Sequence, residues 1–354
     1  MTAHKISTDD LHIASFFPLI TPDEVQKKFP ISQKSIETVY YSRQAIADII
    51  AKRDPRKIII VGPCSIHDPA SALEYARLLK ELAQEVKDKF LLVMRAYFEK
   101  PRTTVGWKGL INDPALDNSF NINEGLAIAR KLLLDITSSG LPVGTESLEP
   151  ISPQYIAELI SWTAIGARTT ESQTHRELAS GLSSPVGFKN NTDGNVEVAI
   201  NAIRSAALPH HFLGIDHFGQ TSIVATKGNP YCHLILRGGK DRPNYDTVSV
   251  NQALASLREA KLMDSLVIDC SHDNSMKDFR NQPNVFFECI HQIARGNAGI
   301  VGLMLESHIY EGQQSLSNNL RYGISITDGC ISFEKTCEII RNAYREFTLA
   351  KIGS

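Results

Sequence analysis

Eight short runs of apolar residues recur along the chain, and polar residues follow them. Most of the runs are rich in Val, Ile and Leu and do not alternate with polar residues, which is typical of parallel strands covered on both faces. The pattern predicts strands at residues 57–61, 90–94, 141–145, 162–167, 185–188, 233–236, 266–270 and 299–305.

Helical patterns separate most of these runs. The clearest spans residues 71–87, where Leu73, Ala76, Leu79 and Leu82 fall on one stripe. Regular alternation of strand and helix indicates a parallel sheet, and eight such units predict a (β/α)8 TIM barrel. An open, doubly wound sheet is the alternative, but it would place its chemistry at one switch point. Polar clusters after all eight runs favour the barrel, because its loops converge at the carboxyl ends of the strands.

Two segments are not needed to close a barrel. Residues 1–52 form an N-terminal extension with a helical pattern, and residues 210–226 resemble a β-hairpin inserted before the sixth strand. We expect residues 53–354 to form one catalytic barrel that includes the hairpin. We expect the extension and the hairpin to serve assembly or regulation, since long additions to a domain are usually functional.

Composition narrows the class of protein. The chain has 354 residues, 42% of them hydrophobic, which suffices for one large core. A formal net charge of −2 argues against nucleic acid or an anionic membrane as the main partner. No apolar run reaches the length of a membrane span, and the six cysteines include no Cys-x-x-Cys pair. We therefore expect a cytoplasmic protein with free thiols.

Lysine and arginine residues follow several of the predicted strands. So many cations cannot share one end of a barrel without anions to neutralise them, and phosphates and carboxylates are the natural ligands. The segment 100–104, with Gly106 close behind, offers side-chain and backbone donors of the kind that a phosphate site needs. The converging cations are Arg95, Lys100, Arg102, Arg168, Lys189 and Arg237.

A second group combines a thiol, an imidazole and two carboxylates: Cys64, His272, Glu306 and Asp328. This mixed set suits a divalent first-row transition metal, because a thiolate disfavours magnesium and calcium. The four residues are far apart in the sequence, so no spacing rule identifies a metal site. A core thiol, a hydrogen-bonded histidine and two carboxylates without metal remain the alternative.

Several long motifs closely resemble those of the type I 3-deoxy-D-arabino-heptulosonate 7-phosphate (DAHP) synthases. The resemblance runs from about residue 15 to residue 345. The motifs that carry it are residues 62–68 (GPCSIHD), 100–109 (KPRTTVGWKG), 166–173 (GARTTESQ), 187–190 (GFKN), 236–239 (LRGG), 269–272 (DCSH) and 306–308 (ESH).

The resemblance implies an enzyme that condenses phosphoenolpyruvate with D-erythrose 4-phosphate and water. The products would be DAHP and phosphate, in the first step of the shikimate pathway. It implies one divalent metal ion (manganese, iron, cobalt or zinc) held by Cys64, His272, Glu306 and Asp328. It places phosphoenolpyruvate against Arg95, Lys100, Glu146, Arg168, Lys189 and Arg237, and the phosphate of erythrose 4-phosphate against Arg102 and Thr103.

Proton-transfer roles follow from the chemistry of these groups. Lys100 is the expected proton donor or electrostatic partner of the new alkoxide, and Glu146, with Asp328 or His272, is expected to position the water.

The resemblance also implies feedback inhibition by an aromatic amino acid, in a homodimer or homotetramer. The expected regulatory residues are Ser183, Phe212 and Gly214. Relatives controlled by phenylalanine tend to carry Ser where this chain has Gly214, and a glycine leaves room beyond the aromatic ring. Tyrosine is therefore the expected inhibitor, ahead of tryptophan and phenylalanine.

Two other functions remain possible from the sequence. A related synthase that uses arabinose 5-phosphate has a similar barrel, but the 100–104 loop and the long extension match the DAHP enzymes better. A non-catalytic, ligand-sensing barrel would have no need of the thiol in the metal set.

Overall fold

In the computed structural model, residues 8–102, 106–240 and 242–350 are described, with side chains as far as residue 347 in the last helix. Eight of the described strands pair in parallel in the order β1-β2-β3-β4-β5-β8-β9-β10, and β10 pairs back with β1. This closure confirms the barrel and excludes the open sheet. The strands are β1 (Lys57–Gly62), β2 (Phe90–Arg95), β3 (Val143–Glu146), β4 (Trp162–Ile165), β5 (Val186–Lys189), β8 (Cys232–Leu236), β9 (Leu266–Asp269) and β10 (Ile300–His308).

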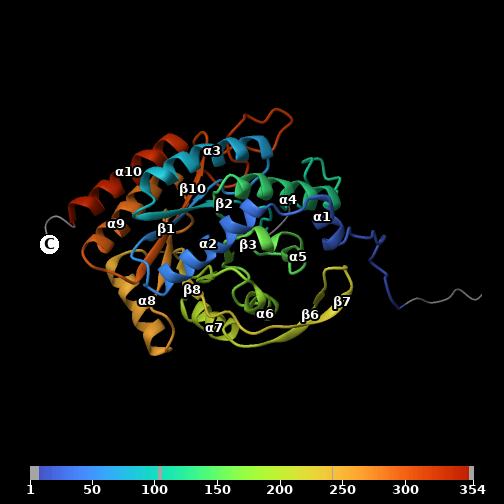
Figure 1. Cartoon of the computed structure of the whole chain (residues 1–354), viewed down its shortest axis with the longest axis horizontal. Coiled ribbons are helices and arrows are strands. Elements are labelled where there is room, and N and C mark those ends of the chain that lie inside the picture. Colours follow the sequence, from blue (N-terminus) through green and yellow to red (C-terminus); the bar gives the residue numbers. More distant parts are fainter. Residues whose placement is uncertain (1–7, 103–105, 241, 351–354) are drawn as a thin grey trace, which may run out of the picture.

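Helices cover the outside of the barrel, as Figure 1 shows. They are α3 (Pro69–Val86), α4 (Ile122–Ser138), α5 (Pro153–Ile156), α6 (Gln173–Gly181), α7 (Glu197–Ala206), α8 (Thr247–Glu259), α9 (Gln282–Ala294) and α10 (Phe333–Ala350), with 3-10 turns at Ala157–Leu159 and Phe279–Asn281. A two-residue strand, β11 (Ile331–Ser332), pairs with the end of β10. No helix in the described ranges is both long enough and apolar enough to cross a membrane.

The continuous apolar runs have a structural cause in the alternation of side chains along each strand. In β1, Ile58 and Ile60 pack inside the barrel with Trp162. Their neighbours Ile59 and Val61 belong to the cluster between the strands and the outer helices. Both faces of the strand are therefore buried, which removes the polar alternation that a half-exposed strand would show.

Part of the N-terminal extension closes the amino end of the barrel. The extension folds into α1 (Pro22–Lys28) and α2 (Gln33–Ile50). Ile46, Ile49 and Ile50 of α2 join the apolar cluster inside the barrel. The hydroxyl of Ser265, beside β9, donates to the carbonyl of Ile50 at 2.7 Å. This end of the barrel is thus packed shut, and the opposite end is free for a site.

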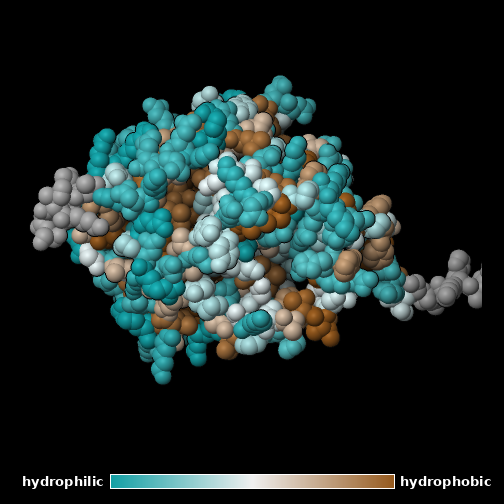
Figure 2. Space-filling model, in the orientation of Figure 1, coloured by the Kyte–Doolittle hydropathy of each residue, from teal (hydrophilic) through white to brown (hydrophobic). Residues whose placement is uncertain are grey.

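The hairpin predicted at residues 210–226 is present as the antiparallel pair β6 (His211–Ile215) and β7 (Thr221–Ala225). It projects beside α1 at the edge of the molecule (Figure 1). The Asp23 N–H at the start of α1 donates to the carbonyl of His217 at the hairpin's tip, at 2.9 Å. Figure 2 shows hydrophobic side chains gathered over the hairpin. The two additions therefore contact each other on one side of the barrel.

Element boundaries differ from the prediction where loops decide them. β3 begins at Val143 and reaches Glu146, and β4 ends at Ile165, because the backbone from residue 166 turns, with Thr169 N–H donating to the Gly166 carbonyl. Leu73 of α3 was expected on the buried stripe but is partly exposed, and Tyr75 lies on that stripe instead.

Candidate active site

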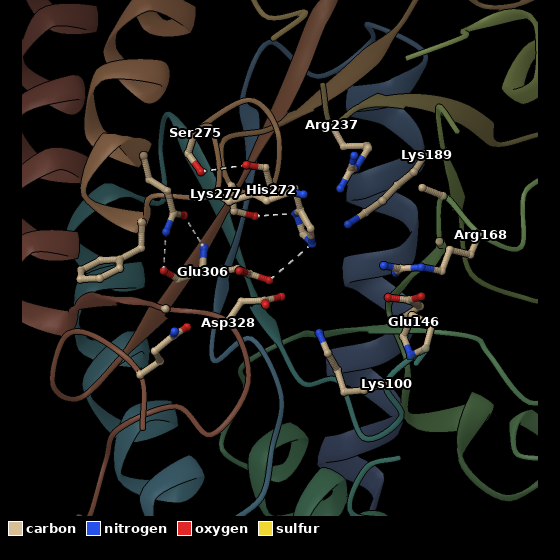
Figure 3. A pocket seen from close by; sticks show the side chains of 18 of the residues that line it. Lys100, Glu146, Arg168, Lys189, Arg237, His272, Ser275, Lys277, Glu306 and Asp328 are labelled. Atoms are coloured by element: carbon tan, nitrogen blue, oxygen red, sulfur yellow. Dashed lines mark hydrogen bonds and ion pairs between the residues drawn. The ribbon is translucent and has the colours of Figure 1, made fainter. Parts of the chain in front are cut away.

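A cavity of about 320 Å³ lies at the carboxyl ends of the barrel strands. Its walls include most of the predicted site residues: Lys100, Arg102, Glu146, Arg168, Lys189, Arg237, His272, Glu306 and Asp328. Figure 3 shows Lys189, Arg237, Arg168 and Glu146 on one side of the space, facing His272, Glu306 and Asp328 on the other. The barrel therefore brings the two predicted groups of side chains to one place.

The cations of the cavity differ in their protein partners. Lys189 ends β5 and pairs with Asp269 at 2.8 Å, and Arg237 follows β8 and pairs with Asp273. The Nε of Arg237 is buried with no hydrogen-bond partner in the described part of the chain. Arg168, in the turn after β4, is exposed to the cavity and forms no ion pair with a described residue. Free donors therefore face the cavity, as an anion site requires.

Arg95 lies beneath the cavity floor, at the end of β2. Its guanidinium is 1% exposed, donates to Glu306 Oε1 at 2.9 Å, and lies 3.5 Å from the centre of the Tyr97 ring. It also donates to the carbonyls of Pro63 and Cys64, at 3.1 and 3.2 Å. These contacts satisfy a buried charge that would otherwise be costly.

The candidate metal ligands approach one another at the opposite wall. Ligand atoms of Cys64, Glu306 and Asp328 all lie within 4.8 Å of one another. His272 Nε2 lies 3.9 Å from Glu306 Oε1, so the imidazole flanks this group. One sulfur, one nitrogen and two carboxylates fit a divalent transition metal in number and type.

The charges of neighbouring groups shift the pKa values of Cys64 and Asp328. Burial, with the charge of Glu306, raises the pKa of the Cys64 thiol to about 11, and Lys100 opposes the rise. Lys100 Nζ lies 3.1 Å from Cys64 Sγ. Burial alone would raise the pKa of Asp328, but Lys100 and His272 outweigh it and leave that pKa lowered. Asp328 is therefore a carboxylate at neutral pH, while Cys64 needs a cation to become a thiolate.

Glu146, the last residue of β3, can point into the cavity because a glycine, Gly166, directly follows the neighbouring strand β4. A Cβ added to Gly166 would lie 2.3 Å from Glu146 Oε1. The carboxylate is 7% exposed and lines the cavity between Lys100 and Arg168 (Figure 3). Gly166 is thus needed to admit this side chain.

The remaining predicted residues lie at the edge of the cavity, away from it, or outside the described residues. Arg102 is exposed at the cavity's edge, and its Nε donates to the Trp107 carbonyl at 2.8 Å. Thr103 lies outside the described residues. Ser183 is exposed, and Phe212 and Gly214 lie on the partly buried face of the hairpin.

Sequence reasoning assigned no role to Asp269, Lys277 and Gln282, which also belong to the site. Asp269 is fully buried beneath Lys189, and Lys277 and Gln282 line the cavity. Gln282 exchanges two hydrogen bonds with the backbone of Glu306, at 2.8 and 3.0 Å. Asp269 could have been found, because it ends an apolar run just as the predicted cations do. Lys277 and Gln282 do not end an apolar run, so the sequence gives no sign that they belong to the site.

The chain thus combines a (β/α)8 barrel with a cluster of cations and a candidate metal-ligand set at the carboxyl ends of its strands. The family model "DAHP synthetase I family" matches residues 28–341, so the chain belongs to that family. The chain is 54% identical to the Tyr-sensitive phospho-2-dehydro-3-deoxyheptonate aldolase of Escherichia coli over 345 residues, 97% of each protein.

Other relatives extend this finding. The Phe-sensitive aldolase of Escherichia coli is 54% identical over 335 residues, covering 94% of this chain and 95% of that protein. The tyrosine-inhibited enzyme of Candida albicans is 52% identical over 342 residues, with 94% and 92% covered. The solved structure of the aldolase from Francisella tularensis superimposes with a TM-score of 0.94 at 49% identity, covering 96% of this chain and 99% of that one.

Proposed function

We propose that this protein condenses phosphoenolpyruvate with erythrose 4-phosphate and water, giving DAHP and inorganic phosphate. The observation that carries the proposal is the cavity itself, where a cluster of lysine and arginine side chains faces the Cys, His, Glu and Asp set. Two phosphorylated substrates need such cations, and an aldehyde needs an electrophilic partner. The named relatives are phospho-2-dehydro-3-deoxyheptonate aldolases, which supports the same reaction.

Phosphoenolpyruvate would bind on the cationic side. Arg168, Lys189 and Arg237 would neutralise its phosphate, and Arg95 its carboxylate. Arg95, already paired with Glu306, would add positive charge from below. Arg102, with Thr103, would hold the phosphate of erythrose 4-phosphate at the cavity's edge. This arrangement fixes the face of the enol that meets the aldehyde.

Cys64, His272, Glu306 and Asp328 would hold one divalent ion of manganese, iron, cobalt or zinc. When bound, such an ion supplies Lewis acidity toward an aldehyde oxygen.

The side chains then divide the proton transfers. C3 of phosphoenolpyruvate attacks the aldehyde carbon, and Lys100 delivers a proton to the oxygen that becomes the new hydroxyl. Water adds to the cationic C2, and Glu146 takes the proton that it releases, with Asp328 or His272 helping to position the water. The hemiketal phosphate collapses as the C2 hydroxyl passes its proton to the departing phosphate: the C2 carbonyl forms, the C–O bond to phosphate breaks, and Arg168, Lys189 and Arg237 stabilise the phosphate that leaves.

The test is consumption of phosphoenolpyruvate by the purified protein. With erythrose 4-phosphate and manganese present we expect turnover, which a chelator abolishes and added metal restores. Arabinose 5-phosphate in place of erythrose 4-phosphate should give little product. Absence of turnover with every metal in the reduced protein would contradict the proposal and favour a ligand-sensing barrel.

We further propose that an aromatic amino acid, tyrosine first, inhibits this enzyme, and that the chain works as a homodimer or homotetramer in the cytoplasm. Residues 1–52 and the 210–226 hairpin would serve regulation and assembly beside the catalytic barrel of residues 53–354, with Ser183, Phe212 and Gly214 at the inhibitor site. The contact between Asp23 and His217 links these additions, and the names of the relatives point to tyrosine or phenylalanine.

A further inference from the structure

Asp269 is a buried carboxylate outside the candidate metal-ligand set, and it contacts both halves of the site. It ends β9 and is 0% exposed. Its Oδ2 accepts from Lys189 Nζ at 2.8 Å and lies 2.9 Å from His272 Nδ1. Its Oδ1 accepts from the backbone N–H and the hydroxyl of Ser271, at 3.0 and 2.6 Å. Both oxygens are thus fully engaged.

The contact with His272 decides which ring nitrogen is available. A carboxylate beside Nδ1 favours the tautomer in which Nδ1 carries the hydrogen, so that Nε2 keeps a free lone pair. That Nε2 is the atom on the side of Glu306, 3.9 Å from its Oε1. The backbone also holds the ring, because His272 has φ +55° and its carbonyl accepts from the Lys277 N–H at 2.7 Å.

The contact of Asp269 with Lys189 lies on the cationic side of the cavity, where phosphoenolpyruvate would bind. Lys189 is 3% exposed, and a buried ion is costly unless a partner of opposite charge lies against it. Asp269 supplies that anion from below, which leaves the rest of the ammonium directed at the cavity (Figure 3). One carboxylate therefore contacts both a proposed phosphate-binding cation and a proposed metal-binding imidazole, and holds each in position.

We propose that Asp269 is a positioning residue that joins the metal site to the phosphoenolpyruvate site. This inference rests on the proposed function, since it takes His272 as a metal ligand and Lys189 as a substrate contact. Asp269 itself touches neither the metal nor the substrate. Its removal should therefore weaken two binding events, that of the metal and that of phosphoenolpyruvate, although Asp269 is a ligand of neither.

The neighbouring Asp273 offers a matched control. It belongs to the same loop and pairs with Arg237, but it makes no contact with the imidazole of His272. Asp269→Asn and Asp273→Asn each remove one charge from beneath one substrate cation. Only the first also removes the carboxylate that orients the metal-binding ring.

The experiment titrates cobalt into metal-free protein without substrate and follows the visible absorption of the bound ion. For Asp269→Asn we expect cobalt to bind about 10- to 100-fold more weakly, with altered bands, as for other partners of metal-binding histidines. The KM for phosphoenolpyruvate should rise as well. Asp273→Asn should raise that KM and leave cobalt binding as in the wild type.

Equal cobalt affinity and spectra for Asp269→Asn and the wild type would overturn the inference. Failure of the wild type to bind cobalt would instead overturn the proposed metal site. If Asp269→Asn does not fold, Ser271→Ala replaces it, because this hydroxyl contacts both Asp269 Oδ1 and His272 Nδ1. We expect weaker cobalt binding there too, and unchanged binding would count against the role of Asp269.

Discussion

Single cations at the cavity differ in what their removal would do to the fold. Arg168 is exposed and has no ion-pair partner among the described residues, so its loss leaves no other group uncompensated. Lys189 is buried against Asp269, and its loss would strand a carboxylate that is 0% exposed. Removing one partner of a buried pair costs about 3–5 kcal/mol of stability. Binding and folding effects can therefore be separated at this site.

Arg168→Ala should raise the KM for phosphoenolpyruvate about 10- to 100-fold, the range expected when one hydrogen bond to a charged group is lost. The melting temperature should stay near that of the wild type. Steady-state kinetics and thermal unfolding measure the two effects. Lys189→Met is the comparison, since it should raise KM and also lower the melting temperature. An unchanged KM for Arg168→Ala would remove this residue from the substrate site.

Glu99, next to Lys100, gives a pH-dependent prediction. Its carboxyl group is 3% exposed, Oε1 has no hydrogen-bond partner in the described chain, and Oε2 accepts from the Ser152 hydroxyl at 3.0 Å. Burial, with Glu149 as a nearby charge, raises its pKa from 4.5 to about 8. Between these two values the unfolded chain loses the proton and the folded protein keeps it, so rising pH costs stability.

Glu99→Gln removes this cost. The variant should match the wild type near pH 5 and exceed it in unfolding free energy at pH 8, by on the order of 3 kcal/mol. Urea unfolding at the two pH values measures the difference. A gain of equal size at both would show that the effect comes from packing and not from ionisation.

At the scale of elements, a single glycine in the hairpin determines how closely the side chains on its partly buried face can pack. Gly214 of β6 lies opposite Ser222 of β7. A Cβ at residue 214 would lie 2.8 Å from Val224 Cγ2 and 3.6 Å from the ring of Phe212. Any larger residue must therefore move Val224, on the same partly buried face. This face is where we propose that the aromatic inhibitor binds.

Gly214→Ser should shift the inhibitor preference from tyrosine toward phenylalanine, because the added hydroxymethyl group fills the space beyond the ring. Inhibition curves with tyrosine, phenylalanine and tryptophan measure the ranking. Turnover without inhibitor is the internal control and should change little, since the hairpin lies outside the cavity. An unaltered ranking would count against an inhibitor site on this hairpin.

The elements also show what the sequence could predict. Strands buried on both faces produce continuous apolar runs, so all eight could be located from the chain alone. Their ends could not, because loop hydrogen bonds set them, as where β4 stops before the turn at Gly166. The packing of α2 was missed for a similar reason. Ile46 and Ile50 mark an apolar stripe, but a stripe does not say that it closes the end of a barrel.

At the scale of the whole molecule, the site residues were predictable because a closed barrel brings all strand ends together. Lys189 and Glu306 lie in β5 and β10, and Arg168 lies in the turn after β4. Only their positions at the ends of apolar runs indicated that they would meet. The role of Asp269 was not predictable in this way, since it depends on a contact with Lys189, 80 positions away. Pairings across the barrel require its register, which periodicity does not provide.

Large apolar side chains are exposed on the hairpin and in the N-terminal segment, and we expect them to mark a surface at which subunits assemble. On the outer face of the hairpin Leu213 is 80% and Ile223 75% exposed, while in the N-terminal segment Phe16 is 75% and Phe17 86% exposed. The hairpin and α1, which the N-terminal segment precedes, contact each other at one edge of the molecule (Figure 1). Exposed apolar side chains gathered on the hairpin are typical of protein–protein interfaces.

Leu213→Asp combined with Ile223→Asp should therefore lower the molecular mass in solution, because two charges would be buried without partners in the interface. Light scattering after size-exclusion chromatography measures the mass.

Val248→Asp is the matched control: Val248 is 65% exposed on α8, away from the hairpin, and its replacement should leave the mass unchanged. Turnover should survive in the double variant, since neither Leu213 nor Ile223 lines the cavity, while sensitivity to tyrosine should fall if assembly completes the inhibitor site. A double variant with the mass of the wild type would mean that subunits meet through another surface.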